Sequence, residues 1–303
     1  MEWFNNFLLN VVPLAPKWAV RLVAKKYFAG ETLESAAQEI QSLNQKGFYS
    51  TADILGENVE DIEEVQQPVE SYLELMEKIS DENLNSGISL KLTQLGLKID
   101  KEQAWKNFEK LLEKAEEQNI FVRIDMEDSS CTDDTLEFYQ KARKKYPDTG
   151  AVLQSYLYRS ENDLLEMVEN GTTNLRICKG IYTEPPEISY QERELISDNF
   201  FKLVRLGLEN DVYIGIATHD LDLIERCENF IEDNDIEPEN YEFQALLGVP
   251  IEKTLKRLRD NGHKVRYYVP FGGEWYAYSM RRLQENPDLA GYIFKDFFKL
   301  KSS

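Results

Sequence analysis

The sequence is short of the residues from which common metal sites are built. It contains two histidines, and its three cysteines, Cys131, Cys178 and Cys227, lie far apart and form no CxxC pair. A zinc site of the usual cysteine and histidine type has no local motif here, and we predict no metal. The odd number and wide spacing of the cysteines also suit a reducing compartment.

The familiar phosphate-binding and hydrolase motifs are missing as well. The chain has no GxGxxG, no GxxxxGK followed by serine or threonine, no GxSxG and no HExxH. Rossmann-type dinucleotide binding, P-loop chemistry and the common serine or zinc hydrolases are therefore not indicated. The pair Gly272-Gly273 is instead typical of a turn between a strand and a helix.

Positive charge is scarce relative to negative charge. Thirty-five lysines and arginines face 55 aspartates and glutamates, which gives a net charge of −20. Such a field repels phosphates, so we predict no nucleic-acid partner.

Long apolar runs are absent too. Residues 1–18 are the most apolar stretch at the N-terminus, but Pro13 and Pro16 interrupt it and it is too short to cross a bilayer. We expect no stable membrane span and a cytoplasmic protein, and the apolar N-terminus leaves room for a peripheral contact at the inner face of the membrane.

What the chain does contain is a regular alternation of strand-like and helical stretches. Helical periodicity covers residues 17–45, and eight strand-like runs follow, separated by helical segments. The runs are 48–55, 88–92, 121–126, 151–157, 174–179, 212–219, 241–247 and 264–270. This count and size predict a (β/α)8 barrel over residues 46–303 after an N-terminal helical segment, 1–45, with a doubly wound open sheet as the competing architecture.

The predicted strands share a second pattern. Each has one apolar face, and its other face carries a polar residue close to the C-terminal end, where barrel active sites lie. These residues are Lys91, Asp125, Gln154, Arg176, His219, Gln244 and Tyr268. One such residue is weak support for a site, but several on successive strands indicate a shared one, because buried polar groups need partners.

The polar residues near the predicted mouth are mainly cationic and aromatic. They include Lys91, Arg176, Lys179 and Tyr268, and they predict an anionic ligand in an acidic protein. Residues 275–285 add a last helix, which the glycine turn lets fold over the barrel mouth. One stripe of this helix carries Tyr278, Arg281, Arg282 and Glu285. That stripe either binds the ligand or is a solvated face with an Arg281–Glu285 pair.

Seven segments, taken in order, resemble the proline dehydrogenase family over residues 48–290. They read KLTQLGL, RIDMEDS, VLQSYLYRS, LRICKGIY, IATHD, YEFQALLGVP and RYYVPFGGEWYAYSMRRLQEN. The resemblance implies an FAD-dependent (β/α)8 barrel of the monofunctional bacterial type. It also implies oxidation of L-proline to Δ1-pyrroline-5-carboxylate, the first step of proline degradation to glutamate. Electrons would pass to a quinone-type acceptor, and a separate pyrroline-5-carboxylate dehydrogenase would act downstream.

The same resemblance implies roles for individual residues. Asp125 and Arg176 match catalytic positions. Lys91, Arg281 and Arg282 match residues that bind the proline carboxylate, Tyr268 and Tyr278 match walls of the ring pocket, and Glu285 matches a residue that steadies the arginines. Cofactor-lining positions are matched by Met126, Gln154, Lys179, Gly180, Ile181, Thr218 and His219. Ile181 departs from the smaller alanine of many relatives, which bears on pocket shape.

Two other functions are alternatives for this sequence. A Schiff-base lyase would use Lys91 as its nucleophile. A non-catalytic barrel would use the same cationic mouth only to bind an anionic partner.

Overall fold

The computed structural model describes residues 20–21, 24–56, 59, 61 and 63–285, with side chains as far as Met280. Its centre is a closed barrel in which β1 pairs with β8 and every neighbouring pair of strands is parallel. The strands are β1 (Tyr49–Ile54), β2 (Ser86–Leu90), β3 (Val122–Ile124), β4 (Thr149–Gln154), β5 (Asn174–Cys178), β6 (Tyr213–Ala217), β7 (Tyr241–Leu246) and β8 (Val265–Phe271). The predicted barrel is thereby confirmed and the open sheet is excluded.

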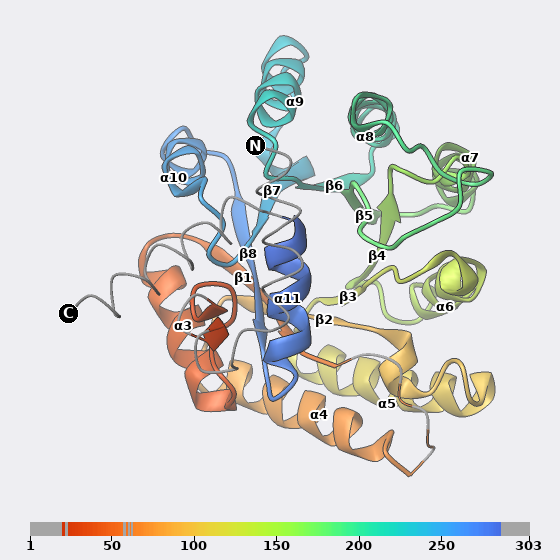
Figure 1. Ribbon diagram of the computed structural model, residues 1–303, viewed down its shortest axis with the longest axis vertical. Coiled ribbons are helices and arrows are strands. Elements are labelled where there is room, and N and C mark those ends of the chain that lie inside the picture. The colour runs from red at the N-terminus through yellow and green to blue at the C-terminus, as the bar shows by residue number, and fades with distance from the viewer. Residues whose placement is uncertain (1–19, 22–23, 57–58, 60, 62, 286–303) are drawn as a thin grey trace.

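Helices surround the barrel and alternate with its strands (Figure 1). They are α3 (Leu33–Gln45), α4 (Gln66–Asp81), α5 (Lys101–Gln118), α6 (Thr132–Ala142), α7 (Ser160–Glu169), α8 (Arg193–Leu208), α9 (Leu221–Asp233), α10 (Glu252–Asp260) and α11 (Trp275–Glu285). Short 3-10 helices occupy Leu92–Leu95, Ser129–Cys131 and Pro238–Asn240. None of the described helices combines the length and apolar character that a membrane span requires.

The two faces of the strands serve different purposes. Apolar residues such as Ile88, Ile124 and Ile177 are fully buried in the core cluster between the strands and the helices. The alternate residues, such as Ser89 and Arg176, point to the inside, which is unusually polar for a barrel of this kind. The period-two reading of the sequence therefore located the apolar core correctly and left a polar interior to be explained.

Helix α11 lies over the mouth of the barrel, as the sequence predicted (Figure 1). Its first residue, Trp275, stacks on Phe28 with ring centroids 5.5 Å apart. The same small apolar cluster includes Leu55, which follows β1, and Tyr278. The cluster holds the start of α11 in place, so that Tyr278 reaches the cavity at the C-terminal ends of the strands.

Three sequence-based details need correction. Helical structure does not continue through residues 17–45, because Gly30 adopts a φ of +100° and Thr32 caps a new helix, α3. The sequence predicts a helix from residue 59, but helix α4 begins at Gln66. This start places Pro68 in the first turn, where its missing N–H costs nothing. Helix α9 was not singled out in the sequence. The division at residues 45 and 46 stays a prediction.

Candidate active site

A cavity of about 1180 Å³ opens at the C-terminal ends of the strands. The predicted site residues whose positions the structure describes all line it: Lys91, Asp125, Met126, Gln154, Arg176, Lys179, Gly180, Ile181, Thr218, His219, Tyr268 and Tyr278. They come from β2, β3, β4, β5, β6, β8 and α11 or from the segments that follow these strands. The fold therefore gathers into one place the residues that the sequence spreads along the chain.

Asp125 is the centre of the polar network in this cavity. Its Oδ1 accepts hydrogen bonds from Ser89 Oγ at 2.6 Å and Arg176 Nη1 at 2.7 Å, and its Oδ2 accepts one from Tyr268 Oη at 2.6 Å. Burial opposes ionisation, but Arg176 and Lys91 outweigh it and hold the pKa of Asp125 below its ordinary value. Asp125 is therefore a fixed, ionised acceptor at neutral pH.

Lys91 lies between two carboxylates. Its Nζ is 2.9 Å from Asp53 Oδ1 and 3.9 Å from Asp125 Oδ2. Asp53 comes from β1 and is almost completely buried, and this burial raises its pKa to about 6 even though Lys91 favours the charged form. Asp53 was not among the residues predicted from the sequence, although strand alternation places it on the same face as Thr51, toward the barrel interior.

Arg176 is held by three groups at once. Its Nε donates to Gln244 Oε1 at 2.6 Å and its Nη1 donates to Asp125. The guanidinium also lies 5.3 Å from the ring centroid of Tyr268, within the range of a cation–π contact. These contacts fix the orientation of Arg176, and Gln244 is the residue of β7 that makes this possible.

A second layer of charge lies below the cavity and does not line it. Arg266 Nε is 2.8 Å from Glu242 Oε1, and the Nη1 of Arg123 donates to the Ala151 carbonyl at 2.8 Å. Burial lowers the pKa of Arg123 to about 9. Strand alternation alone groups Arg266 with Tyr268, Glu242 with Gln244 and Arg123 with Asp125. The first residue of each pair stands two positions earlier in the chain, lies deeper and fills the barrel.

The β3 and β4 side of the cavity contains a buried polar atom without a hydrogen-bond partner among the described residues. Gln154 Nε2 donates to the Met126 carbonyl at 3.3 Å, while Gln154 Oε1 has no hydrogen-bond partner among the described residues. A buried amide oxygen without a partner is costly. A ligand that donates a hydrogen bond at this point would remove that cost.

In the segment after β5, Gly180 packs closely against the ring of Tyr156. Gly180 has a φ of +102°, and a Cβ at this position would lie 2.0 Å from the ring of Tyr156. Glycine is therefore required both by the backbone conformation and by the space. The neighbouring Ile181 is 52% exposed, so its apolar side chain is presented to the cavity opening.

The ends of β5 and β6 are tied together by polar contacts. Lys179 Nζ is 2.7 Å from Asp220 Oδ2 and donates to Ser197 Oγ at 2.9 Å. His219 Nε2 accepts a hydrogen bond from the Leu246 backbone N–H at 3.1 Å, so this nitrogen carries no proton in that contact. His219 thus joins the ends of β6 and β7 within the cavity wall.

The remaining predicted residues belong to α11. Tyr278 is buried and lines the cavity. Arg281, Arg282 and Glu285 fall within the helix, but their side chains lie outside the described residues. Their binding roles stay predictions.

Comparison with known proteins identifies the family. Residues 36–293 match the model of the proline dehydrogenase family. Proline dehydrogenase 2 of Bacillus subtilis (strain 168) is 36% identical over 286 residues, which cover 94% of each chain. The proline dehydrogenase of Deinococcus radiodurans is 32% identical over 282 residues, which cover 91% of this chain and 90% of that one.

Solved structures give the same answer for the fold. Proline utilization A (PutA) from Bdellovibrio bacteriovorus, inactivated by N-propargylglycine, matches with a TM-score of 0.81 and 25% identity. PutA from Bradyrhizobium japonicum, in its D779W form, matches with a TM-score of 0.75 and 20% identity. The chain spans about a third of the length of these structures, 32% and 30%. With the family model matched over residues 36–293, the chain belongs to the proline dehydrogenase family.

Proposed function

We propose that this protein oxidises L-proline to Δ1-pyrroline-5-carboxylate with FAD as its cofactor. The observation that carries the proposal is that Lys91, Asp125, Arg176, Tyr268 and Tyr278 converge on one cavity in a chain of this family. In this cavity, charged groups that can bind the carboxylate and amine of a small amino acid lie beside aromatic rings that can enclose an apolar ring.

The cavity residues fit a flavin. When bound, FAD supplies the acceptor for the hydride that leaves the ring carbon next to nitrogen. Gln154 Oε1 has no hydrogen-bond partner among the described residues, and Gly180, which packs against Tyr156, lines the same side of the cavity. We assign cofactor binding to Met126, Gln154, Lys179, Gly180, Ile181, Thr218 and His219, which line the β3 to β6 side of the cavity.

Substrate binding falls to the opposite side. Lys91 would bind the proline carboxylate from β2, and Arg281 and Arg282 would do so from α11, where a guanidinium fork can make two parallel hydrogen bonds. Tyr268 and Tyr278 would enclose the pyrrolidine ring. Tyr268 is oriented by its bond to Asp125 at 2.6 Å, which fixes the ring wall before substrate arrives.

Proline oxidation also releases a proton from the substrate nitrogen. Two carboxylates lie close to Lys91 in the cavity, those of Asp53 and Asp125. Asp125 is held ionised by Arg176 and Lys91, so we assign to it the electrostatic stabilisation of positive charge on the amine, and the released proton passes to solvent. Arg176 supplies fixed positive charge at the same point, which favours the build-up of negative charge on the electron acceptor.

The proposal also includes the fate of the electrons and of the product. A quinone-type acceptor would receive the electrons, and a separate pyrroline-5-carboxylate dehydrogenase would consume the product. We place the protein in the cytoplasm, with peripheral contact at the inner face of the membrane through residues 1–16, which lie outside the described residues.

The setting of Lys91 argues against a Schiff-base lyase. A nucleophilic lysine must be a neutral amine, whereas Asp53 at 2.9 Å and Asp125 at 3.9 Å both stabilise the ammonium form.

The direct test follows L-proline-dependent reduction of a soluble quinone analogue and chemical trapping of the cyclic imine product. Turnover with L-proline and little with D-proline is the expected result. Quinone reduction that does not depend on proline, or borohydride inactivation through Lys91, would overturn the proposal.

A further inference from the structure

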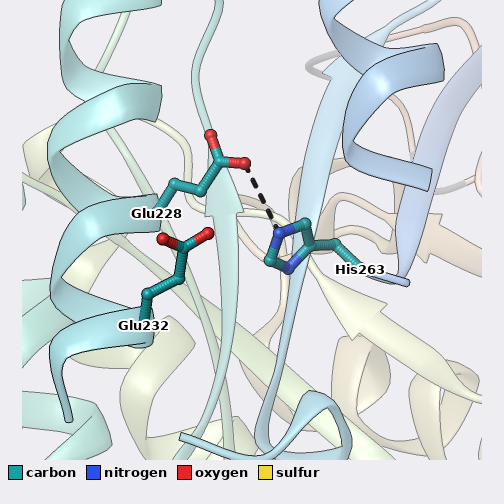
Figure 2. Close-up of side chains that lie close together, drawn as sticks. All are labelled: Glu228, Glu232 and His263. Atoms are coloured by element: carbon teal, nitrogen blue, oxygen red, sulfur yellow. Dashed lines mark ion pairs between the residues drawn. The ribbon is translucent and has the colours of Figure 1, made fainter. Parts of the chain in front are cut away.

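The face of the barrel opposite the cavity carries a second cluster of ligand-type side chains. Glu228 and Glu232 stand one turn apart on α9, and His263 lies in the turn between α10 and β8. Figure 2 shows both carboxylates directed toward the imidazole ring. The end of α9 and the start of β8 lie at the N-terminal ends of the strands, away from the proposed catalytic centre.

The three groups lie close together, and one pair has the separation of ligands that share an ion. One oxygen from each glutamate and one ring nitrogen of His263 all lie within 4.8 Å of one another. His263 Nε2 is 3.5 Å from Glu228 Oε1, which is long for a hydrogen bond. Two ligands that each stand about 2.1 Å from a tetrahedral zinc ion are about 3.4 Å apart, close to this separation.

The surroundings of His263 prepare it for a metal. Tyr241 Oη is 2.7 Å from His263 Nδ1, so the second ring nitrogen has a partner of its own and Nε2 faces Glu228. Such a bond to the other nitrogen is the usual way in which a ligating histidine is oriented. A separate cavity of about 510 Å³, lined in part by Glu232, Tyr241 and His263, provides an entry path.

Arg257 sets a limit on the strength of the site. Its Nη1 and Nη2 donate to the two oxygens of Glu228 at 2.5 and 2.7 Å. Both oxygens of Glu228 are therefore already engaged by the guanidinium of Arg257. Each oxygen keeps a second lone pair for a metal, although the guanidinium charge makes the site weaker than a closed four-ligand zinc site.

We propose that Glu228, Glu232 and His263 bind one divalent transition-metal ion of the zinc class. Such an ion would join α9 to the turn before β8, and its role would be structural, independent of proline oxidation. Three protein ligands leave a fourth coordination position, which water from the 510 Å³ cavity can fill. The sequence predicted no metal because the ligands come from separate segments and form no local motif.

The test is Zn²⁺ binding by the full chain, measured by calorimetry and by competition with a chromophoric chelator. Wild type should bind one equivalent at this site, and Glu232→Gln and His263→Gln should each weaken it at least about 10-fold. Asp233→Asn is the matched control, because Asp233 is an exposed neighbour on the same helix and off the ligand face. It should stay within about twofold of wild type.

A second readout separates binding at this site from binding elsewhere. Zn²⁺ should raise the unfolding temperature of wild type and of Asp233→Asn but not of Glu232→Gln. Glu232 is exposed, so its replacement is expected to leave the fold intact. Equal Zn²⁺ affinity in wild type and both ligand variants, or no binding to wild type, would overturn the proposal.

Discussion

Lys91 and Asp53 form an ion pair inside the barrel mouth, with Nζ 2.9 Å from Oδ1. Asp53 lies in β1 and is only 1% exposed, and Lys91 directly follows the neighbouring strand β2. The lysine charge is therefore balanced by protein carboxylates rather than set in a purely cationic pocket. Under the proposed function, a proline carboxylate enters a site whose charges are already paired and ordered.

This pairing predicts strong coupling between the two residues. At pH 7, Lys91→Met should lower the free energy of unfolding by about 3 kcal/mol, because it leaves the buried carboxylate of Asp53 without its main countercharge. Asp53→Asn should cost much less, because it removes the buried carboxylate as well as its bond to Lys91. The double variant should lose less than the sum of the two single losses. Urea denaturation of the four proteins measures the coupling, and strictly additive losses would show that the pair is not an energetic unit.

The raised pKa of Asp53 predicts a specific dependence of stability on pH. Its native pKa of about 6 lies above the value of about 3.9 in the unfolded chain, so the native state binds this proton more tightly. From this carboxyl alone, the free energy of unfolding is highest below pH 4 and falls as pH rises through 6.

Asp53→Asn removes that slope, so its stability relative to wild type should increase between pH 4 and pH 7. The increase should be at most about 3 kcal/mol, at about 1.36 kcal/mol for each unit of pKa shift. Denaturation at a series of pH values gives the difference directly. A constant difference across this range would mean that the buried carboxyl keeps its ordinary pKa.

Arg281 is predicted to bind the substrate carboxylate. Arg281→Met should raise KM for L-proline about 10-fold to 100-fold, as expected when a charge-assisted pair is lost. Arg205→Met is the control, since Arg205 is half-exposed on α8 and its nearest carboxylate, Glu209, is 3.6 Å away. Steady-state kinetics should leave KM of the control unchanged, and an unchanged KM in Arg281→Met would assign that residue to the solvated face of α11.

Gly180 is predicted to be irreplaceable for conformational reasons. Gly180→Ala puts a Cβ in a backbone with a φ of +102° and against the Tyr156 ring, so it should destabilise the protein by more than about 1 kcal/mol and weaken flavin binding. Gly273→Ala is the matched control, because a Cβ there meets no described atom within 4 Å. Thermal unfolding and flavin fluorescence compare the two, and equal behaviour would refute the role of Gly180.

Much of this arrangement could be predicted from the sequence because a barrel strand has a simple period. Alternation of apolar and polar residues identified Lys91, Asp125, Arg176 and Tyr268, and parallel strands bring their C-terminal ends to one face. Asp53 was not predicted because its strand, Tyr49–Ile54, mixes polar and apolar residues, and a buried acid there is explained only by its partner. That partner, Lys91, directly follows another strand.

The sequence also did not predict which inward-facing residues line the cavity and which lie deeper in the barrel. Arg123, Glu242 and Arg266 obey the same alternation as the cavity residues but lie below them. Position within a strand orders the residues of that strand by depth, but neighbouring strands of a barrel are staggered, so a comparison of depth between strands requires the register of the closed sheet. The roles of Arg281 and Arg282 rest on their place in α11 and on the family.

The central claim, a flavin reduced by L-proline in this cavity, is tested most directly by visible absorption. The spectrum of the purified full chain would be recorded without oxygen after addition of FAD, then again after L-proline. We predict an oxidised-flavin band that bleaches with L-proline and persists with D-proline. A bound flavin that keeps its band in the presence of L-proline, or a protein that takes up no flavin, would contradict the account.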